Sequence, residues 1–374
     1  MSNSSSGANA AAPAPQLLSM AQCSALRGLA ILGIVLHNYC HWLGLAVKEN
    51  EYPFTAANCR ALLERMASPD GNWAVHLLSF FGHYGVPVFL FLSAYGLYMK
   101  YEKGAANASV APQHLPTWGF VRYHYLKLFK MMIVGFVAFT MVDAITPGSF
   151  HYSVKIILGQ LGMFNNLYPD PDHNIWPGPY WFFGLMLQLY IVYRLLLFRR
   201  HWGVAVALVA VCWALQAVCG PESDALNRLR YNCIGGVLPF VGGLMFARFG
   251  RDLSRAAWGG VAIVSALVVV AFSFNYQLWF WAPLAVCSFS IGLVKVLPRN
   301  INDVLAWVGS ISAAMFVMHP ITRKIFIPIS RRGDVYTGLL LYIIASIALA
   351  WLGRELMKKI PSPHMTLQNT STKQ

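Results

Sequence analysis

The stretch that decides the fold is residues 24–47, SALRGLAILGIVLHNYCHWLGLAV, a long apolar run that carries one arginine and two histidines. Arg27 and His37 are ten residues apart in this run. On a helix their Cα atoms would lie about 15 Å apart along the axis, at ~1.5 Å per residue. An arginine inside hydrocarbon costs ~2.5–3.5 kcal/mol on insertion scales, so a span that keeps a cation and an imidazole indicates a functional site. The spacing suits Arg27 near one headgroup layer and His37 near the middle of the bilayer.

The composition of the whole chain agrees with a membrane protein. Of 374 residues, 57% are hydrophobic and 11% charged, and the mean hydropathy is +0.51. Soluble domains usually carry about 25% charged residues. We therefore expect an all-α integral membrane protein with about ten transmembrane helices around a central cavity and no separate soluble domain. The expected spans are 24–47, 76–99, 125–146, 180–198, 202–219, 232–249, 256–274, 277–297, 304–327 and 335–357.

The expected domain organisation is one membrane domain with two short tails. Residues 22–360 form the membrane domain, and residues 1–21 and 361–374 form disordered tails. The first twenty residues contain no Lys or Arg, so they lack the basic region with which a secretory signal begins. The seven cysteines form no C-x-x-C pair, so we expect buried thiols and neither a disulfide framework nor a zinc site.

The net charge of +14 does not indicate nucleic acid, because of where the cations lie. Most Lys and Arg residues fall in connections that are cytoplasmic if the amino terminus is cytoplasmic, so the positive-inside rule predicts both termini in the cytoplasm. One group breaks the rule, since it lies on the outer side of this count: Arg323, Lys324, Arg331 and Arg332. This exception indicates either an outer loop that contacts anions or an error in the span count.

His37 and His41 stand four residues apart, a spacing that also suits two metal ligands on one helix face. No acidic motif such as H-E-x-x-H accompanies them, so we expect no metal. A lone histidine in an apolar run is often structural, and it is the presence of Arg27 that favours a catalytic role for His37. Asp143 is the nearest candidate among the carboxylates of the spans to orient a histidine, and its alternative interpretation is a residue at the membrane interface.

Four basic side chains gather at the start of the third expected span: Arg122, His124, Lys127 and Lys130. Residues 124, 127 and 130 step by three and stay close on a helix surface. They can bind a phosphate-rich ligand by charge-assisted hydrogen bonds. The alternative is an anchor whose cations reach the lipid headgroups.

Four further residues are candidates for lining a substrate site. His83 and His319 lie at depths similar to that of His37 if both termini are cytoplasmic, although His319 also suits a structural role before Pro320. The segment 165–181, NNLYPDPDHNIWPGPYW, reads as an irregular loop rich in aromatic rings and amides. Its last two residues, Tyr180 and Trp181, suit a platform for sugar rings, and the alternative is an aromatic belt at the membrane interface.

Five segments in this order resemble acyltransferase family 3, bacterial multi-span membrane proteins that mostly O-acetylate glycans. They are LRGLAILGIVLHN (26–38), GVPVFLFLSAYGL (85–97), PGPYWFFGLMLQLYIVYRLL (177–196), YNCIGGVLPFVGGLMFAR (231–248) and WVGSISAAMFVMHPI (307–321). The first matches the family's Arg-x10-His helix. The chain departs from the family's pattern at three places. It has His124-x-x-Lys127 where the family has Arg-x-x-Arg, and Leu-Ser-Ala where the family has Leu-Ser-Gly. It also has Gln188 where an acidic residue is common in the family.

The resemblance implies that acetyl-CoA or another acyl-CoA approaches the basic cluster from the cytoplasm of a bacterium whose inner membrane holds the protein. His37 would deprotonate an acceptor hydroxyl or carry the acyl group transiently, and Arg27 would orient the thioester. The acceptor would be a glycan or a lipid-linked sugar. The sequence does not indicate the acceptor's identity or the oligomeric state.

Two other functional classes compete with an acyltransferase. A secondary transporter of a small polar or anionic solute would be expected to show inverted halves, and none is detectable between residues 24–198 and 202–357. A receptor or scaffold would leave the insertion cost of Arg27 and His37 unexplained. Hydrolysis of acetyl-CoA by the reconstituted protein would separate the first class from the other two.

Overall fold

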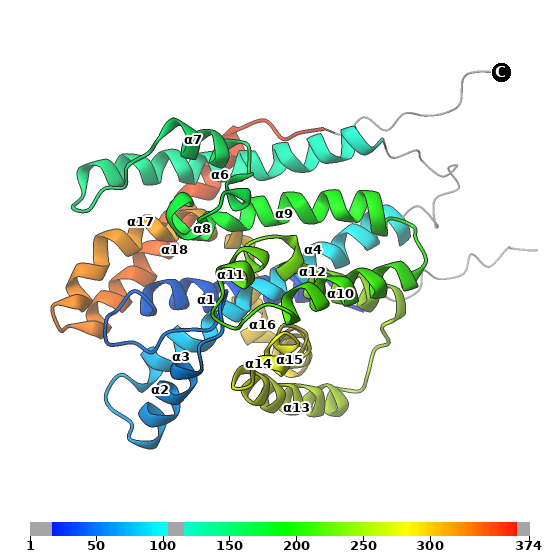
Figure 1. Ribbon diagram of the computed structural model, residues 1–374, viewed down its shortest axis with the longest axis horizontal. Helices are drawn as coiled ribbons and strands as arrows, with labels where there is room; N and C mark the ends of the chain where they lie inside the picture. The colour runs from blue at the N-terminus through cyan, green and yellow to red at the C-terminus, as the bar shows by residue number, and fades with distance from the viewer. Residues whose placement is uncertain (1–16, 104–115, 365–374) are drawn as a thin grey trace, which may run out of the picture.

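The computed structural model describes residues 17–103 and 116–364, and every regular element in these two ranges is a helix (Figure 1). The amino-terminal part contains α1 (Met20–Cys40), α2 (Ala56–Ala67), α3 (Trp73–Phe81), η1 (Gly82–Tyr84), α4 (Gly85–Tyr98), η2 (Met99–Lys103) and α6 (Thr117–Ile145). The middle contains α7 (Val154–Leu161), η3 (Asn165–Leu167), α8 (Pro171–Asn174), η4 (Gly178–Tyr180), α9 (Trp181–Val192), η5 (Tyr193–Leu197), α10 (Trp202–Ala217), α11 (Asp224–Arg230) and α12 (Cys233–Phe249). The rest contains α13 (Arg255–Ser273), α14 (Tyr276–Trp279), α15 (Ala282–Val296), α16 (Arg299–Ser310), α17 (Ser312–Arg331) and α18 (Val335–Lys359).

Within the described ranges, six helical runs are long and apolar enough to cross a membrane: α1, Trp73–Lys103, α6, Gly178–Leu197, α13 and α18. Two bent pairs raise the number to as many as eight if each pair is one span. These are α11 with α12, bent by 41°, and α16 with α17, bent by 69°. The remaining apolar helices, α10 and α15, are shorter. The prediction of an all-helical membrane protein is confirmed for the described residues, whereas the count of ten spans and a single central cavity stay predictions.

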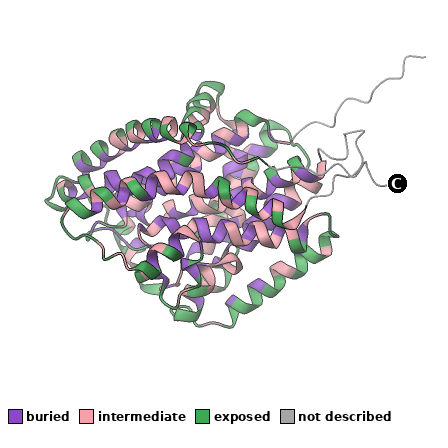
Figure 2. Cartoon of the chain, turned by 90° about the horizontal axis from the view of Figure 1, so that it is seen from above, coloured by how far each residue is buried: buried purple, intermediate pink, exposed green. Residues whose placement is uncertain are grey.

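The helix surfaces agree with a lipid environment. Ile263, Val264 and Leu267 on α13 are each at least 60% exposed although they are apolar. Figure 2 shows buried positions gathered along the inner helices and exposed positions along the outer ones. An exposed apolar face on a helix long enough to cross a membrane is the face expected to lie against hydrocarbon. Of the tails expected to be disordered, residues 1–16 and 365–374 lie outside the described residues.

Helix α1 holds Arg27 and His37 and packs against α3, η1, α4, α16 and α17. It begins four residues before the expected span 24–47 and ends at Cys40, seven residues before the end of that span. Its start is capped, because Ser19 accepts a hydrogen bond from the Gln22 backbone and the Gln22 side chain accepts one from the Ser19 backbone. The crossing with α16 is very close. A β-carbon on Gly28 would lie 1.9 Å from the carbonyl oxygen of Leu305, and one on Gly309 would lie 1.8 Å from that of Ser24. Only glycine permits this approach, which fixes α1 next to Arg27.

Candidate functional site

Two of the cavities that α1 lines contain the residues of interest. The first, which we call the histidine cavity, has a volume of about 290 Å³. Its walls include His37, His41, Glu49, Glu51, His83 and Trp181. The second, the basic cavity, has a volume of about 600 Å³. Its walls include Arg27, Tyr123, His124, Lys127, Lys130 and Tyr190. The two residues that dominate the first apolar run, Arg27 and His37, therefore face different cavities.

The two cavities share part of their walls. Ile34, Phe182 and Phe316 line both of them. These residues come from α1, α9 and α17, three helices that are far apart in the sequence. Ile34 lies between Arg27 and His37 on α1, so the shared wall lies between the cation and the imidazole. A ligand that fills one cavity therefore ends close to a ligand that fills the other.

The orientation of His37 is set by a backbone carbonyl. Its Nδ1 lies 2.8 Å from the carbonyl oxygen of Ser79 at the end of α3. A carbonyl only accepts, so Nδ1–H donates and Nε2 keeps its lone pair. Ser79 is itself held, because its hydroxyl donates to the carbonyl of Val47 at 2.6 Å. A β-carbon on Gly82 would come within 2.6 Å of the His37 β-carbon, so this glycine lets the two segments meet.

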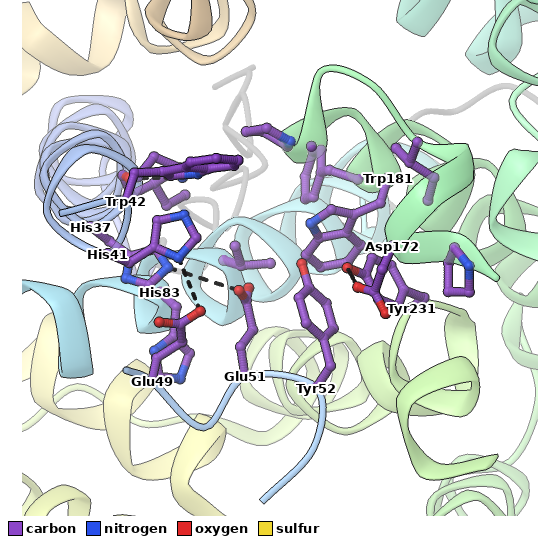
Figure 3. Close-up of a pocket in the computed structure, with 18 of the residues that line it drawn as sticks. His37, His41, Trp42, Glu49, Glu51, Tyr52, His83, Asp172, Trp181 and Tyr231 are labelled. Atoms are coloured by element: carbon purple, nitrogen blue, oxygen red, sulfur yellow. Dashed lines mark hydrogen bonds and ion pairs between the residues drawn. The ribbon is translucent and has the colours of Figure 1, made fainter. Parts of the chain in front are cut away.

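Two carboxylates from the connection after α1 face the histidines (Figure 3). Glu51 lies with a carboxylate oxygen 3.9 Å from Nε2 of His37. Glu49 lies 3.1 Å from Nδ1 of His41, and the ring of His41 stacks on that of His37 with centroids 4.8 Å apart. The ring of His83 approaches His37 edge-on at 5.6 Å. His37 is thus surrounded by two imidazoles and two acids, in a position that is 3% exposed.

The two acids differ in protonation. Burial raises the pKa of Glu51 to about 8, and the neighbouring Glu49 adds to this rise. Burial also opposes ionisation of Glu49, but the hydrogen bond from His41 and the electrostatic effect of the two neighbouring histidines outweigh it and hold the pKa of Glu49 below the usual range. At neutral pH Glu49 therefore carries the negative charge, while Glu51 is mostly protonated.

His37, His41 and Glu49 are also the residues that could hold a metal ion. One donor atom from each lies within 4.8 Å of the others. Two histidines and a glutamate form the protein ligands of several catalytic zinc sites. Among the described residues, Nε2 of His41 and the second carboxylate oxygen of Glu49 have no hydrogen-bond partner. The donor set fits a metal, although His41 and Glu49 already pair with each other.

The opposite wall of the histidine cavity is aromatic. Tyr52 stacks on Tyr231 with centroids 3.9 Å apart, and Trp181 meets Tyr52 edge-on at 5.4 Å. The hydroxyl of Tyr231 donates to Asp172 at 2.6 Å. Figure 3 shows these four side chains grouped on one side of the pocket and the histidines on the other. Much of this wall belongs to the irregular loop 165–181, which therefore closes the cavity that holds His37.

The basic cavity gathers most of the cluster predicted to bind phosphate. His124, Lys127 and Lys130 on α6 line it together with Arg27. Lys130 donates to the hydroxyl of Ser362 at 3.0 Å, and the ring of His124 lies 4.2 Å from that of Tyr190. Arg122 is exposed and does not line the cavity. The break between α16 and α17 adds hydroxyls to the wall, those of Ser310 and Ser312.

Two of the residues expected to line the substrate site are packed elsewhere. Tyr180 is fully buried and donates to the carbonyl of Val317 at 2.9 Å. His319 is also fully buried, with Nδ1 3.1 Å from the carbonyl of Met315 one turn earlier. Neither lines the two cavities. Both contacts are typical of a structural role. For His319 this is the alternative interpretation given by its position before Pro320.

The sequence analysis missed Glu49 and Glu51, and it singled out Asp143 instead. Asp143 is fully buried away from the histidines and pairs with Lys324. The signal for the two glutamates was weak: an acidic pair directly after the expected span 24–47. Their approach to His37 requires the connection to fold back over the helix end, which no local pattern predicts.

The cations that broke the positive-inside rule are mostly bound within the protein. Helix α17 extends to Arg331, so Arg323 and Lys324 lie in a helix and not in a loop. Lys324 pairs with Asp143, and Arg331 donates to the carbonyl of Trp42 at 2.8 Å. Arg323 lines the histidine cavity. The exception to the rule is therefore explained for these three residues by contacts inside the fold.

Comparisons with known proteins agree with the resemblance noted in the sequence. The model of the family 3 acyltransferase domain matches residues 22–355. No curated protein and no solved structure matches the chain at a comparable level.

Proposed function

Because the chain belongs to acyltransferase family 3 over nearly all of its length, we propose that it transfers an acyl group from a coenzyme A thioester to a hydroxyl group. Acetyl is the proposed acyl group, and a carbohydrate or lipid-linked glycan is the proposed acceptor. We further propose that it acts in a bacterial inner membrane, with ten spans and both termini in the cytoplasm. Ten helices or bent pairs at the expected positions support this count.

One observation carries the proposal: the basic cavity and the histidine cavity meet at Ile34, Phe182 and Phe316. A transferase must bring two substrates together, and here each has a chamber of suitable chemistry. Coenzyme A phosphates suit the cavity of Arg27, Lys127 and Lys130. A polyhydroxylated acceptor suits the cavity whose walls combine carboxylates and aromatic rings. The reacting groups would meet at the shared wall.

His37 is the proposed general base. Its Nε2 has a free lone pair, because Nδ1–H donates to Ser79. Nε2 removes the proton of the acceptor hydroxyl as the oxygen attacks the thioester carbonyl. The tetrahedral intermediate then collapses, the carbon–sulfur bond breaks, and the coenzyme A thiolate takes up the proton from His37. The products are an ester and free coenzyme A, so atoms and charge balance.

Glu49 is the proposed counter-charge for this step. It is the ionised acid of the cavity, and its donor atom lies within 4.8 Å of that of His37. A carboxylate at this distance stabilises the imidazolium that forms when His37 takes up a proton. Arg27 cannot take this part, because it is a cation and lines the other cavity. Arg27 instead holds the donor.

Replacing His37 with alanine tests the proposal. Purified protein in lipid nanodiscs is supplied with acetyl-CoA and surface glycans, and mass spectrometry follows the added acetyl groups. We expect His37→Ala to lose at least about 100-fold in rate, the scale of general base catalysis. His151→Ala is the matched control, because His151 is exposed and outside both cavities. Wild-type transfer by well-folded His37→Ala protein would refute the assignment.

A further inference from the structure

Arg323 is a buried cation that the proposed chemistry does not use. It lies on α17, is 5% exposed, and lines the histidine cavity. Its guanidinium carbon lies 4.9 Å from the centre of the Trp42 ring. A buried charge is costly unless an opposite charge and hydrogen bonds compensate it. The buried charge of Arg323 therefore requires a compensating group, either from the protein or from a ligand.

The protein compensates Arg323 only weakly. One terminal nitrogen lies 3.4 Å from the backbone oxygen of Asn38 and 3.4 Å from its side-chain oxygen. These are long hydrogen bonds for a guanidinium, which has five N–H donors. Across residues 17–103 and 116–364, no carboxylate lies within 4.0 Å of Arg323. Its neighbour Lys324, by contrast, pairs directly with Asp143.

The acids of the histidine cavity are engaged elsewhere. Glu49 pairs with His41 at 3.1 Å. Asp172 accepts hydrogen bonds from Tyr231 and from Asn227, both at 2.6 Å. Glu51 faces His37, with a carboxylate oxygen 3.9 Å from Nε2. The charge of Arg323 is thus left without a carboxylate partner among the described residues, although it faces a cavity of about 290 Å³.

We propose that Arg323 binds an anionic group of the acceptor, a carboxylate or a phosphate, within the histidine cavity. The planar guanidinium fork matches both groups and can donate two parallel hydrogen bonds to either. Asn38, which contacts Arg323, directly follows His37 on α1, so the bound anion would hold an acceptor hydroxyl beside the base. The inference rests on the proposed function and narrows its substrate class to acidic or phosphate-bearing sugars.

A structural role is the competing explanation. Asn38 lies in the last turn of α1, where backbone carbonyls give the helix end a partial negative charge that a cation stabilises. If this were the whole role of Arg323, its loss would lower the thermal stability of the protein. It would not change which ligands the protein prefers. Ligand preference therefore separates the two roles.

The experiment compares ligand binding by four proteins in nanodiscs: wild type, Arg323→Gln, Arg323→Lys and Arg331→Gln. Saturating coenzyme A first fills the basic cavity, and the shift of the thermal midpoint is then titrated with glucuronic acid, glucose 1-phosphate or glucose. Arg331→Gln is the matched control, because it removes an exposed cation of the same helix outside the cavity. The two anionic probes distinguish a carboxylate from a phosphate.

We expect the wild type and Arg331→Gln to bind at least one anionic sugar about 10- to 100-fold more tightly than glucose, the scale of a charge-assisted hydrogen bond. Arg323→Gln should lose this preference, and Arg323→Lys should keep part of it. Equal binding of all three sugars by the wild type, or an unchanged preference in Arg323→Gln, would overturn the inference. These outcomes are independent of His37→Ala, whose acetyl transfer tests the proposed function alone.

Discussion

At the scale of single residues, the proposed chemistry depends on which nitrogen of His37 is free. The carbonyl of Ser79 holds Nδ1–H, so the lone pair of Nε2 points toward Glu51 and the cavity. The first helix supplies the imidazole, and a second, α3, supplies the carbonyl that orients it. Glu49 then supplies the charge. Sequence identifies the imidazole, but the two partners become visible only in three dimensions.

The counter-charge can be removed without changing the size of the side chain. We expect Glu49→Gln to lower kcat about 10- to 100-fold, because one charge-assisted interaction with the protonated base is lost. The KM for acetyl-CoA should stay constant, since the donor occupies the other cavity. Steady-state kinetics with varied acetyl-CoA measure both constants. An unchanged kcat would show that Glu49 does not support the base.

Glu51 gives a prediction about pH and stability. Its pKa rises from 4.5 to about 8 on folding, so the folded state holds the proton more tightly. Stability contributed by this group is therefore lost as the pH rises from about 5 to about 8. Glu49, whose pKa is lowered, is ionised in both states across this window and adds no slope.

The comparison that isolates Glu51 is the thermal midpoint of the wild type against that of Glu51→Gln in nanodiscs. Relative to the variant, the wild type should become progressively less stable between about pH 5 and about pH 8. Taking the difference removes the contribution of the histidines, which both proteins share. A difference that is constant across this window would contradict the raised pKa.

At the scale of elements, the break between α3 and α4 sets the position of His37. The predicted second span lies within the helical run Trp73–Lys103. This run changes from α-helix to a 3₁₀ turn, η1, at Gly82–Tyr84. Gly82 contacts α1 at His37, and Gly85 contacts α1 about two turns earlier, where a β-carbon would lie 2.3 Å from the carbonyl oxygen of Ala30. The turn therefore lets two backbones touch beside the proposed base.

Gly82→Ala tests this contact, and Gly96→Ala is its control in the same helical run. A methyl group on Gly82 would meet the His37 β-carbon at 2.6 Å, whereas one on Gly96 meets nothing within 4 Å. We expect Gly82→Ala to lower transfer about 10-fold or more, because small displacements of a catalytic group are costly. Gly96→Ala should keep wild-type activity. Equal activity of the two variants would show that the contact does not position His37.

The helices themselves were largely predictable from sequence, and the irregular segments were not. In hydrocarbon a long apolar run must satisfy its backbone groups internally, which favours a helix. Each expected span accordingly overlaps a helix or a pair of helices, although the first ends at Cys40 and not at residue 47. The 69° bend between α16 and α17 falls inside an apolar stretch and has no local signal. The connection that brings Glu49 and Glu51 to the histidines is likewise determined by packing. Arg323 was recognised as exceptional by its charge, but its cavity was not.

At the scale of the whole molecule, the proposed donor and acceptor sites lie in separate cavities. Arg27, Lys127 and Lys130 line one cavity, and Glu49, Glu51, His37 and Arg323 line the other. Helix α1 passes both, and α9 and α17 contribute Phe182 and Phe316 to the wall between them. Such an arrangement would let a charged thioester donor stay on one side while its acyl group reaches the other.

A structure of the protein with bound acetyl-CoA, determined by cryo-electron microscopy, tests this central claim most directly. The account predicts that the phosphates lie in the basic cavity near Arg27, Lys127 and Lys130, and that the thioester carbonyl reaches the wall of Ile34, Phe182 and Phe316. Acetyl-CoA bound in the histidine cavity, or bound with its thioester directed away from His37, would contradict it.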